Sequence, residues 1–155
     1  MRKSELIERV KELKKENSVV ILAHYYVDES IQQIADFVGD SYYLSQMALK
    51  QDQNNILFCG VKFMGESAKI LSPNKKIIMP NMDADCPMAY MISEEKIAEV
   101  RRRYDDLAVV CYINSTAQIK AISDVCVTSS NAVQIISKLS QKNIFFIPDQ
   151  HLGRY

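Results

Sequence analysis

The chain has 155 residues, of which 48% are hydrophobic and 25% are charged, with 19 basic against 19 acidic side chains. This composition supplies enough apolar material for a core and excludes a wholly disordered chain. A formal net charge of zero argues against a nucleic-acid binder that depends on broad phosphate neutralisation. No apolar run approaches the roughly 20 residues that span a bilayer, and residues 1–17 are too charged for a signal peptide. We therefore expect a cytoplasmic protein.

Helical and strand-like segments alternate along the chain. Residues 4–15 place apolar side chains at helical spacing. Compact apolar runs then follow in the order VVILAHYY, ILFCG, KIIMP, LAVVCYI, DVCVTS and NIFFIP, and the segments DESIQQIADF, SYYLSQMALK, MGESAKIL, SEEKIAEVRRRY, TAQIKAI and NAVQIISKLS have helical patterns. Solid apolar strands separated by helices are typical of a parallel sheet that is covered on both faces. The sequence predicts an α/β fold of three-layer αβα units with short parallel sheets.

An internal repeat organises these segments. Residues 19–67 align without a gap with residues 107–155, so that IADFVGDS at 34–41 matches ISDVCVTS at 122–129 and Gly65 matches Gly153. The repeat predicts two copies of one αβα unit, the first at 1–88 and the second at 89–155. The second copy lacks counterparts of the helix, strand and loop that follow Gly65. We therefore expect the second unit to be incomplete and the chain to be cut short.

The four cysteines occupy two kinds of sequence context. Cys59, Cys111 and Cys126 lie in apolar stretches, where a thiol is expected to be a small buried hydrophobe. Cys86 lies in the polar segment PNMDADCPM, as either a surface thiol or a metal ligand. No CxxC spacing is present, so the sequence favours reduced thiols over disulfides and lacks a self-contained zinc or cluster motif.

Polar side chains gather where the predicted strands end. In open parallel sheets, ligands bind beyond the carboxyl ends of the strands. The candidate residues at these ends are His24, Tyr26 and Ser41 in the first copy and Tyr112, Asn114 and Ser129 in the second. We expect the matching ends to converge on one central cleft. The alternatives are that His24 is a satisfied interface histidine and that the two serines cap the helices that follow them.

The ordered segments AHYY, DFVGDSYYLS, GVKFMGESAKILSP, MPNMDADCPMA, YINSTA, VTSSNA and PDQHLG resemble quinolinate synthase. The resemblance covers almost the whole chain after the first predicted helix. It implies three pseudo-equivalent αβα units around a central cleft, each contributing one cysteine to an oxygen-sensitive [4Fe-4S] cluster. It also implies a transferase of de novo NAD biosynthesis that condenses iminoaspartate with dihydroxyacetone phosphate to form quinolinate.

The resemblance assigns roles only to the matching positions of this chain. Cys86 corresponds to the first of the three cluster thiolates. Tyr26 and Tyr112 correspond to catalytic residues, with Tyr26 implicated in proton transfer. The residues that correspond to substrate contacts are His24, Ser41, Tyr112, Asn114 and Ser129.

This sequence departs from the family pattern beyond Tyr155, where the other two cluster cysteines and the third unit would lie. Because one thiolate cannot hold a [4Fe-4S] cluster, we expect the 155-residue chain alone to have neither the cluster nor synthase activity. The alternative functions are a non-enzymatic α/β fragment that binds small carboxylates and a thiol redox protein that uses Cys86. The expected partners are the two small-molecule substrates, with no nucleic acid and no membrane. Self-association and a completing chain both remain open.

Overall fold

The structure is a computed structural model that describes residues 2–154, in two compact units whose boundary in the sequence falls between Asp85 and Cys86. The first unit contains a four-stranded parallel sheet in the order β2-β1-β3-β4. Its elements are α1 (Lys3–Glu16), β1 (Val19–His24), α2 (Glu29–Gln32), β2 (Phe37–Gly39), α3 (Ser41–Lys50), β3 (Asn55–Cys59), α4 (Lys62–Leu71) and β4 (Lys76–Ile78).

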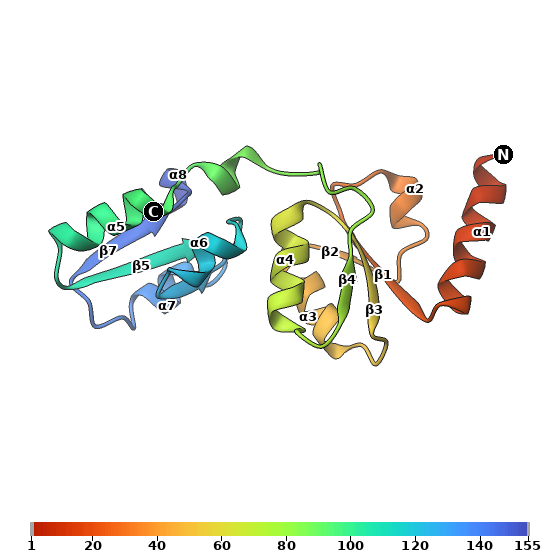
Figure 1. The fold of residues 1–155 in the computed structure, drawn as a ribbon, viewed down its shortest axis with the longest axis horizontal. Coiled ribbons are helices and arrows are strands. Elements are labelled where there is room, and N and C mark those ends of the chain that lie inside the picture. The colour runs from red at the N-terminus through yellow and green to blue at the C-terminus, as the bar shows by residue number, and fades with distance from the viewer. Residues whose placement is uncertain (1, 155) are drawn as a thin grey trace. The chain divides into compact units, whose positions relative to one another are not determined.

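Helices cover both faces of this first sheet (Figure 1). On one face, Ile21 and Ala23 of β1 pack against Val10 of α1 and Ile31 of α2. On the other face, α3 contacts β1 and β2, and α4 contacts α3 and β4. Strand β1 is central and almost wholly buried, which explains its continuous apolar sequence.

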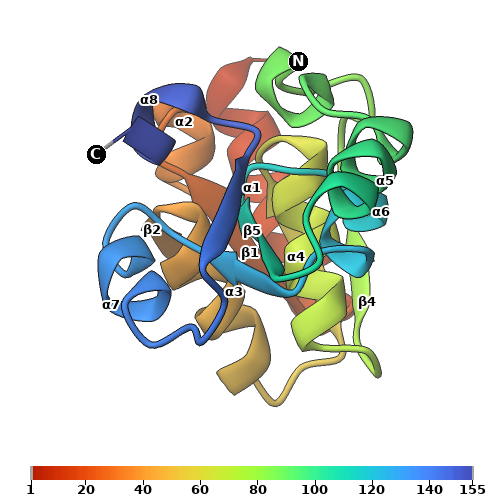
Figure 2. The same cartoon turned by 90° about the vertical axis from the view of Figure 1, so that its left-hand side faces the viewer.

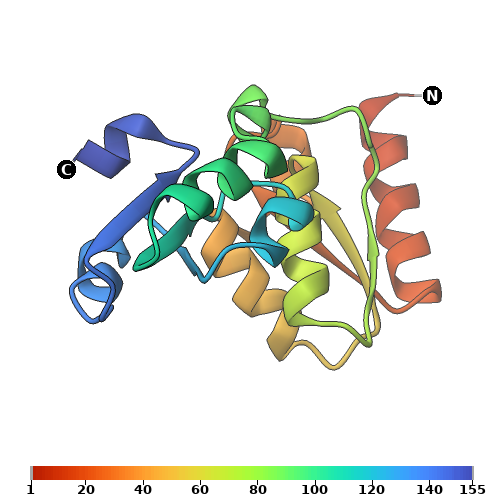
Figure 3. The ribbon, with the colours of Figure 1, turned by 60° about the vertical axis from the view of Figure 1, so that its left-hand side comes forward.

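The second unit repeats this arrangement with a three-stranded parallel sheet in the order β6-β5-β7. A short 3₁₀ helix at Pro87–Tyr90 precedes α5 (Glu94–Arg103), β5 (Leu107–Tyr112), α6 (Ala117–Ala121), β6 (Val125–Val127), α7 (Ala132–Ile136), β7 (Asn143–Ile147) and α8 (Gln150–Arg154). Figure 2 shows α5 and α6 on one side of β5 and α7 on the other. Figure 3 shows β7 leading into α8. The predicted α/β class, with parallel sheets between helical layers, is confirmed.

The repeat seen in the sequence is present in the strands. Strands β5, β6 and β7 begin and end 88 residues after β1, β2 and β3. The strand register repeats as well, because Leu22 pairs with Phe37 in the first unit and Val110 pairs with Val125 in the second. The structure therefore contains two copies of one αβα unit.

Two predicted helices are shorter than the sequence pattern suggested. The helix expected over DESIQQIADF ends at Gln32, and residues 37–39 join the sheet as β2. Asp36 causes this change, because its backbone N–H and its carboxylate both bond to the backbone of Ile21 in β1. The helix expected over NAVQIISKLS likewise covers only Ala132–Ile136.

No helix within residues 2–154 is both long and apolar enough to cross a membrane.

Candidate functional site

His24 is the last residue of β1, and its side chain is only 4% exposed. Its Nδ1 accepts a hydrogen bond from the backbone N–H of Tyr26 at 3.2 Å. Burial lowers the pKa of His24, while the nearby Asp40 carboxylate acts in the opposite direction. Because an Nδ1 that accepts carries no proton, the neutral ring holds its proton on Nε2. His24 can therefore donate one hydrogen bond to a ligand at this edge of the sheet.

Two tyrosines surround the His24 ring. The ring centroids of Tyr25 and Tyr26 lie 4.4 and 4.6 Å from that of His24, and 4.5 Å from one another. Tyr26 is 81% exposed and Tyr25 is 47% exposed. The Tyr26 ring is thus accessible at the surface while it remains in contact with His24.

Ser41 comes shortly after β2, the strand that pairs with His24. Strands β1 and β2 pair in register through His24 and Gly39, and Ser41 follows Gly39 by two residues. Helix α3 begins at Ser41, and its N-cap is Asp40, which accepts a hydrogen bond from the Tyr43 N–H at 2.7 Å. The interpretation of Ser41 as the capping residue is therefore wrong. The structure brings His24, Tyr26 and Ser41 together at the carboxyl edge of the first sheet.

The second unit places its candidate residues at the equivalent edge of its own sheet. Tyr112 ends β5 and pairs in register with Val127 of β6. Asn114 lies in the loop after β5, and Ser129 follows β6 by two residues. Tyr112 and Asn114 are half-buried and Ser129 is exposed.

Ser129 does not cap the helix that follows it. Helix α7 begins at Ala132, three residues later, and its N-cap is Asn131. The Asn131 side chain accepts a hydrogen bond from the backbone N–H of Thr128 at 2.7 Å and thereby closes the turn that carries Ser129. The capping interpretation of Ser129 is wrong for this reason.

Cys86 is a half-buried thiol just before the 3₁₀ helix of the second unit. Within residues 2–154, no three His, Cys, Asp or Glu side chains lie close enough together to hold a metal ion. A [4Fe-4S] cluster needs three or four thiolate ligands. The residues that the structure describes therefore do not by themselves fit a cluster.

The other cysteines follow the sequence expectation with one exception. All four cysteines lie within the described residues, and none forms a disulfide. Cys59 and Cys111 are buried as expected, and burial raises the pKa of Cys59. Cys126, which was expected to be buried, is exposed. Cys126 lies on the edge strand β6, and Val127, which faces the other side of the same strand, is buried in the core.

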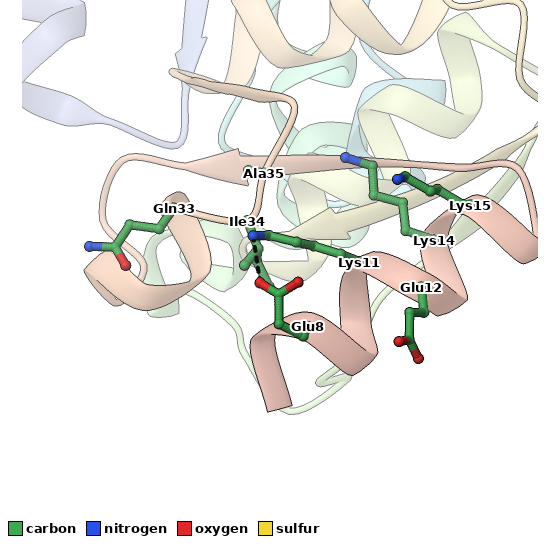
Figure 4. Close-up of a pocket in the computed structure, with 8 residues that line it drawn as sticks. All are labelled: Glu8, Lys11, Glu12, Lys14, Lys15, Gln33, Ile34 and Ala35. Carbon is green, nitrogen blue, oxygen red and sulfur yellow. Dashed lines mark hydrogen bonds and ion pairs between the residues drawn. The ribbon is translucent and has the colours of Figure 1, made fainter. Parts of the chain in front are cut away.

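A pocket in the first unit lies away from these candidate residues. It is lined by charged side chains of α1, among them Glu8, Lys11 and Lys14, and by residues 33–35 (Figure 4). Residues 33–35 precede β2, so the pocket is at the amino-terminal end of that strand. Ligands of parallel sheets bind at the opposite end, and the pocket is not part of the candidate site.

Sequence reasoning missed Asp40 and the stacking role of Tyr25. Asp40 both caps α3 and acts electrostatically on His24. Its signal was available, because an aspartate directly before a helical pattern is a typical N-cap. The contact between Tyr25 and His24 depends on how the chain turns after β1, and no sequence pattern signals it.

The two units together define an α/β protein of repeated parallel αβα units that present polar residues at their carboxyl edges. A profile of the family described as "Quinolinate synthetase A protein" matches residues 8–155. The chain belongs to this family.

Curated relatives agree with this family. The chain is 61% identical to the quinolinate synthase of Fusobacterium nucleatum over 148 residues, which are 96% of this chain and 50% of the relative. It is 55% identical to that of Clostridium perfringens strain SM101 over 148 residues, covering 96% of this chain and 49% of the relative. It is 50% identical to that of Methanosarcina barkeri over 155 residues, covering 100% of this chain and 51% of the relative. The chain spans about half the length of the curated relatives it matches, and the resemblance seen in the sequence is confirmed.

Proposed function

We propose that this chain forms the first part of a quinolinate synthase, which condenses iminoaspartate with dihydroxyacetone phosphate to give quinolinate for NAD biosynthesis. The observation that carries the proposal is the family match over residues 8–155. The polar carboxyl edge of each unit supports it, since these edges are where open parallel sheets bind ligands. The proposal includes a cytoplasmic location, which the four cysteines without disulfides support.

In the first unit, we assign His24 and Ser41 to substrate binding. The buried His24 ring has its Nε2–H available as a neutral donor, as its hydrogen bond from Tyr26 indicates. Ser41 is the first residue of the ten-residue helix α3, where free backbone N–H groups favour an anion. A carboxylate at this edge can accept hydrogen bonds from His24 and Ser41.

Tyr26 is assigned to proton transfer. Its ring is 81% exposed, so a substrate at the sheet edge has access to its hydroxyl. The contact with His24 fixes the direction of the ring. General acid–base catalysis by a positioned side chain contributes about 10²–10⁴-fold to a rate, and we expect Tyr26 to contribute in this range.

In the second unit, Tyr112, Asn114 and Ser129 are assigned to substrate binding, and Tyr112 also to catalysis. The exposed Ser129 occupies the repeat position of Ser41. Because both reactants are anionic, binding is a matter of orientation and of neutralising charge with donors.

Cys86 is assigned as one of three thiolates that hold the [4Fe-4S] cluster of the complete enzyme. The third unit of the family would supply ligands that the described residues lack. The chemistry assigned to this chain is accordingly confined to substrate binding and proton transfer. The alternative function is a non-enzymatic fragment that only binds small carboxylates. The same binding without catalysis is what we expect of the isolated 155-residue chain.

A chimera tests the proposal. Residues 1–155 would be joined to the remaining half of the Fusobacterium nucleatum relative, and quinolinate formation would be assayed without oxygen. We expect an active enzyme whose kcat falls at least 100-fold in Y26F and stays within about two-fold in the matched control Y25F. A folded, cluster-loaded chimera that forms no quinolinate would contradict the proposal.

A further inference from the structure

Two cysteines of the second unit lie side by side on neighbouring strands. Cys111 of β5 and Cys126 of β6 are direct register partners in a parallel ladder. Register partners of parallel strands point their side chains to the same face of the sheet. Cys111 is fully buried among Ile97, Val109 and Ile119, and Cys126 is exposed. One thiol of the pair thus lies in the core of the unit, and the other lies at its surface.

The strand geometry disfavours a disulfide between these two residues. Neighbouring strands lie about 4.7–4.9 Å apart, and parallel Cα–Cβ bonds keep the two Cβ atoms at about this separation. A disulfide needs Cβ atoms about 3.5–4.5 Å apart. When two thiolates bind opposite sides of one d¹⁰ ion, with a metal–sulfur bond of about 2.3 Å as for Zn²⁺, their two sulfur atoms lie about 4.6 Å apart. A bridging ion suits the pair better than a direct bond.

The surroundings of the pair favour a thiolate. A hydrogen bond from the Cys126 thiol, helped by the hydroxyls of Ser115 and Ser123 and by the charge of Lys120, lowers the pKa of Cys111 to about 6 against the effect of burial. The same hydrogen bond raises the pKa of Cys126. Cys111 is therefore the more acidic thiol of the pair, although its Sγ also donates a hydrogen bond to the Tyr112 carbonyl at 3.4 Å.

We propose that Cys111 and Cys126 form a two-thiolate site for a soft monovalent d¹⁰ cation, with Cu(I) as the ion it takes. Thiolates select Cu(I) and Zn²⁺ among the first-row metal ions. A four-coordinate ion such as Zn²⁺ needs further ligands, and within residues 2–154 no third His, Cys, Asp or Glu joins the pair. This site is separate from Cys86 and goes beyond the proposed synthase function.

Binding involves no change of oxidation state. Cu(I) forms two Cu–S bonds, the two thiols together release two protons to solvent, and the product is a bis-thiolate complex with one negative charge. Lys120 acts electrostatically on both thiols and would offset this charge. Since the Cys126 side is exposed, the ion can enter without unfolding of the unit.

The first unit supplies a matched control. The repeat positions of Cys111 and Cys126 hold Ala23 and Val38, which are also register partners on neighbouring strands. This position of the αβα unit therefore accommodates an Ala–Val pair. The variant C111A/C126V copies that pair and C126V copies its valine, and both are expected to fold as the parent does.

The test is an oxygen-free titration of the 155-residue chain with Cu(I) in competition with bicinchoninate, in a C86S background. We expect one Cu(I) per chain, with the affinity falling more than about 100-fold in C126V and C111A/C126V. This loss exceeds the 10–100-fold that is typical of residues outside a metal's ligand set. X-ray absorption is expected to show two sulfur neighbours. Circular dichroism checks that each variant is folded. C126S removes the same thiol by a different substitution, so an equal loss of affinity there can be assigned to the missing thiol.

Three results would overturn the inference. One is a Cu(I) affinity of folded C126V and C126S equal to that of the parent, because the ion would then lie elsewhere. The second is a spectrum with three or four ligands, and the third is Zn²⁺ bound by the pair as tightly as Cu(I). The synthase assay of the chimera is a separate measurement, so its failure would leave this result intact.

Discussion

Asp36 and Ile21 bond to each other through two hydrogen bonds across the first unit. The Ile21 N–H donates to Asp36 Oδ2 at 2.8 Å, and the Asp36 N–H donates to the Ile21 carbonyl at 2.8 Å. In the second unit, Asp124 and Val109 make the same pair of bonds at 2.7 and 3.0 Å. The repeat thus preserves a specific device that ends the crossover after α2 or α6 and aligns the next strand.

This device predicts a stability loss when either carboxylate is removed. Ile21 is 1% exposed and Val109 is fully buried, so D36A and D124A would each leave a buried N–H without its acceptor. We expect each variant to lose about 1–3 kcal/mol of unfolding free energy, measured by urea unfolding followed by circular dichroism. The exposed Asp105 offers a control, and D105A should stay within about 0.5 kcal/mol. Equal stability of D36A, D124A and D105A would show that the bonds contribute little.

The sequence predicted the buried strands and the repeat because solid apolar blocks and their spacing carry that information directly. It missed the start of β2 because the helical pattern DESIQQIADF runs to Phe37, whereas the hydrogen bonds between Asp36 and Ile21 assign Phe37 to the sheet. It also treated Cys126 as buried, since an edge strand and a central strand have the same apolar pattern. Strand order, and which face of the edge strand is covered, depend on tertiary packing.

The sequence predicted which residues form the candidate site but not the structural role that each has in its own helix or strand. Ser and Asp are both good N-caps, and a shift of one residue in the helix start decides between Ser41 and Asp40. The sequence pattern leaves that shift open. The sequence pattern also could not predict the burial of His24, because this burial depends on the rings of Tyr25 and Tyr26 turning back onto the strand end.

Removing the cap and removing the proposed ligand should have different effects. We expect D40A to lose about 0.5–2 kcal/mol of unfolding free energy, because the Tyr43 N–H loses its acceptor. S41A should change stability by no more than about 0.5 kcal/mol and should raise the KM of the chimera for its substrate. Urea unfolding and steady-state kinetics measure the two effects. A stability loss in S41A as large as that in D40A would restore the capping role to Ser41.

The burial of His24 predicts a dependence of stability on pH. Its folded-state pKa is below the ordinary value of 6.5 because burial penalises the charged ring. Between those two pKa values the unfolded chain binds a proton that the folded chain does not, so stability falls as the pH drops below 6.5. Protonation would also remove Nδ1 as the acceptor of the Tyr26 N–H.

NMR titration of the imidazole signals checks this dependence, since the chain has only two histidines and H151N identifies the His24 signal. We expect a His24 midpoint below 6.5. D40N should lower it further, because the Asp40 carboxylate favours the charged ring. A midpoint above 6.5, or an upward shift in D40N, would be inconsistent with a desolvated neutral histidine.

The single thiol of Cys86 predicts the behaviour of the isolated chain with iron and sulfide. One thiolate leaves a [4Fe-4S] cluster short of the three or four ligands it needs, so anaerobic reconstitution of residues 1–155 should yield no stable cluster and no quinolinate. The charge-transfer absorbance between thiolate and iron should be the same in the parent and in C86S after desalting. In the chimera with the Fusobacterium nucleatum half, by contrast, C86S should abolish the cluster that the parent chimera holds. A four-iron cluster that survives desalting on the isolated chain would mean that other cysteines complete the ligand set. Because Cys59 and Cys111 are buried and a four-iron cluster is much larger than a single ion, such a result would require the described fold to open.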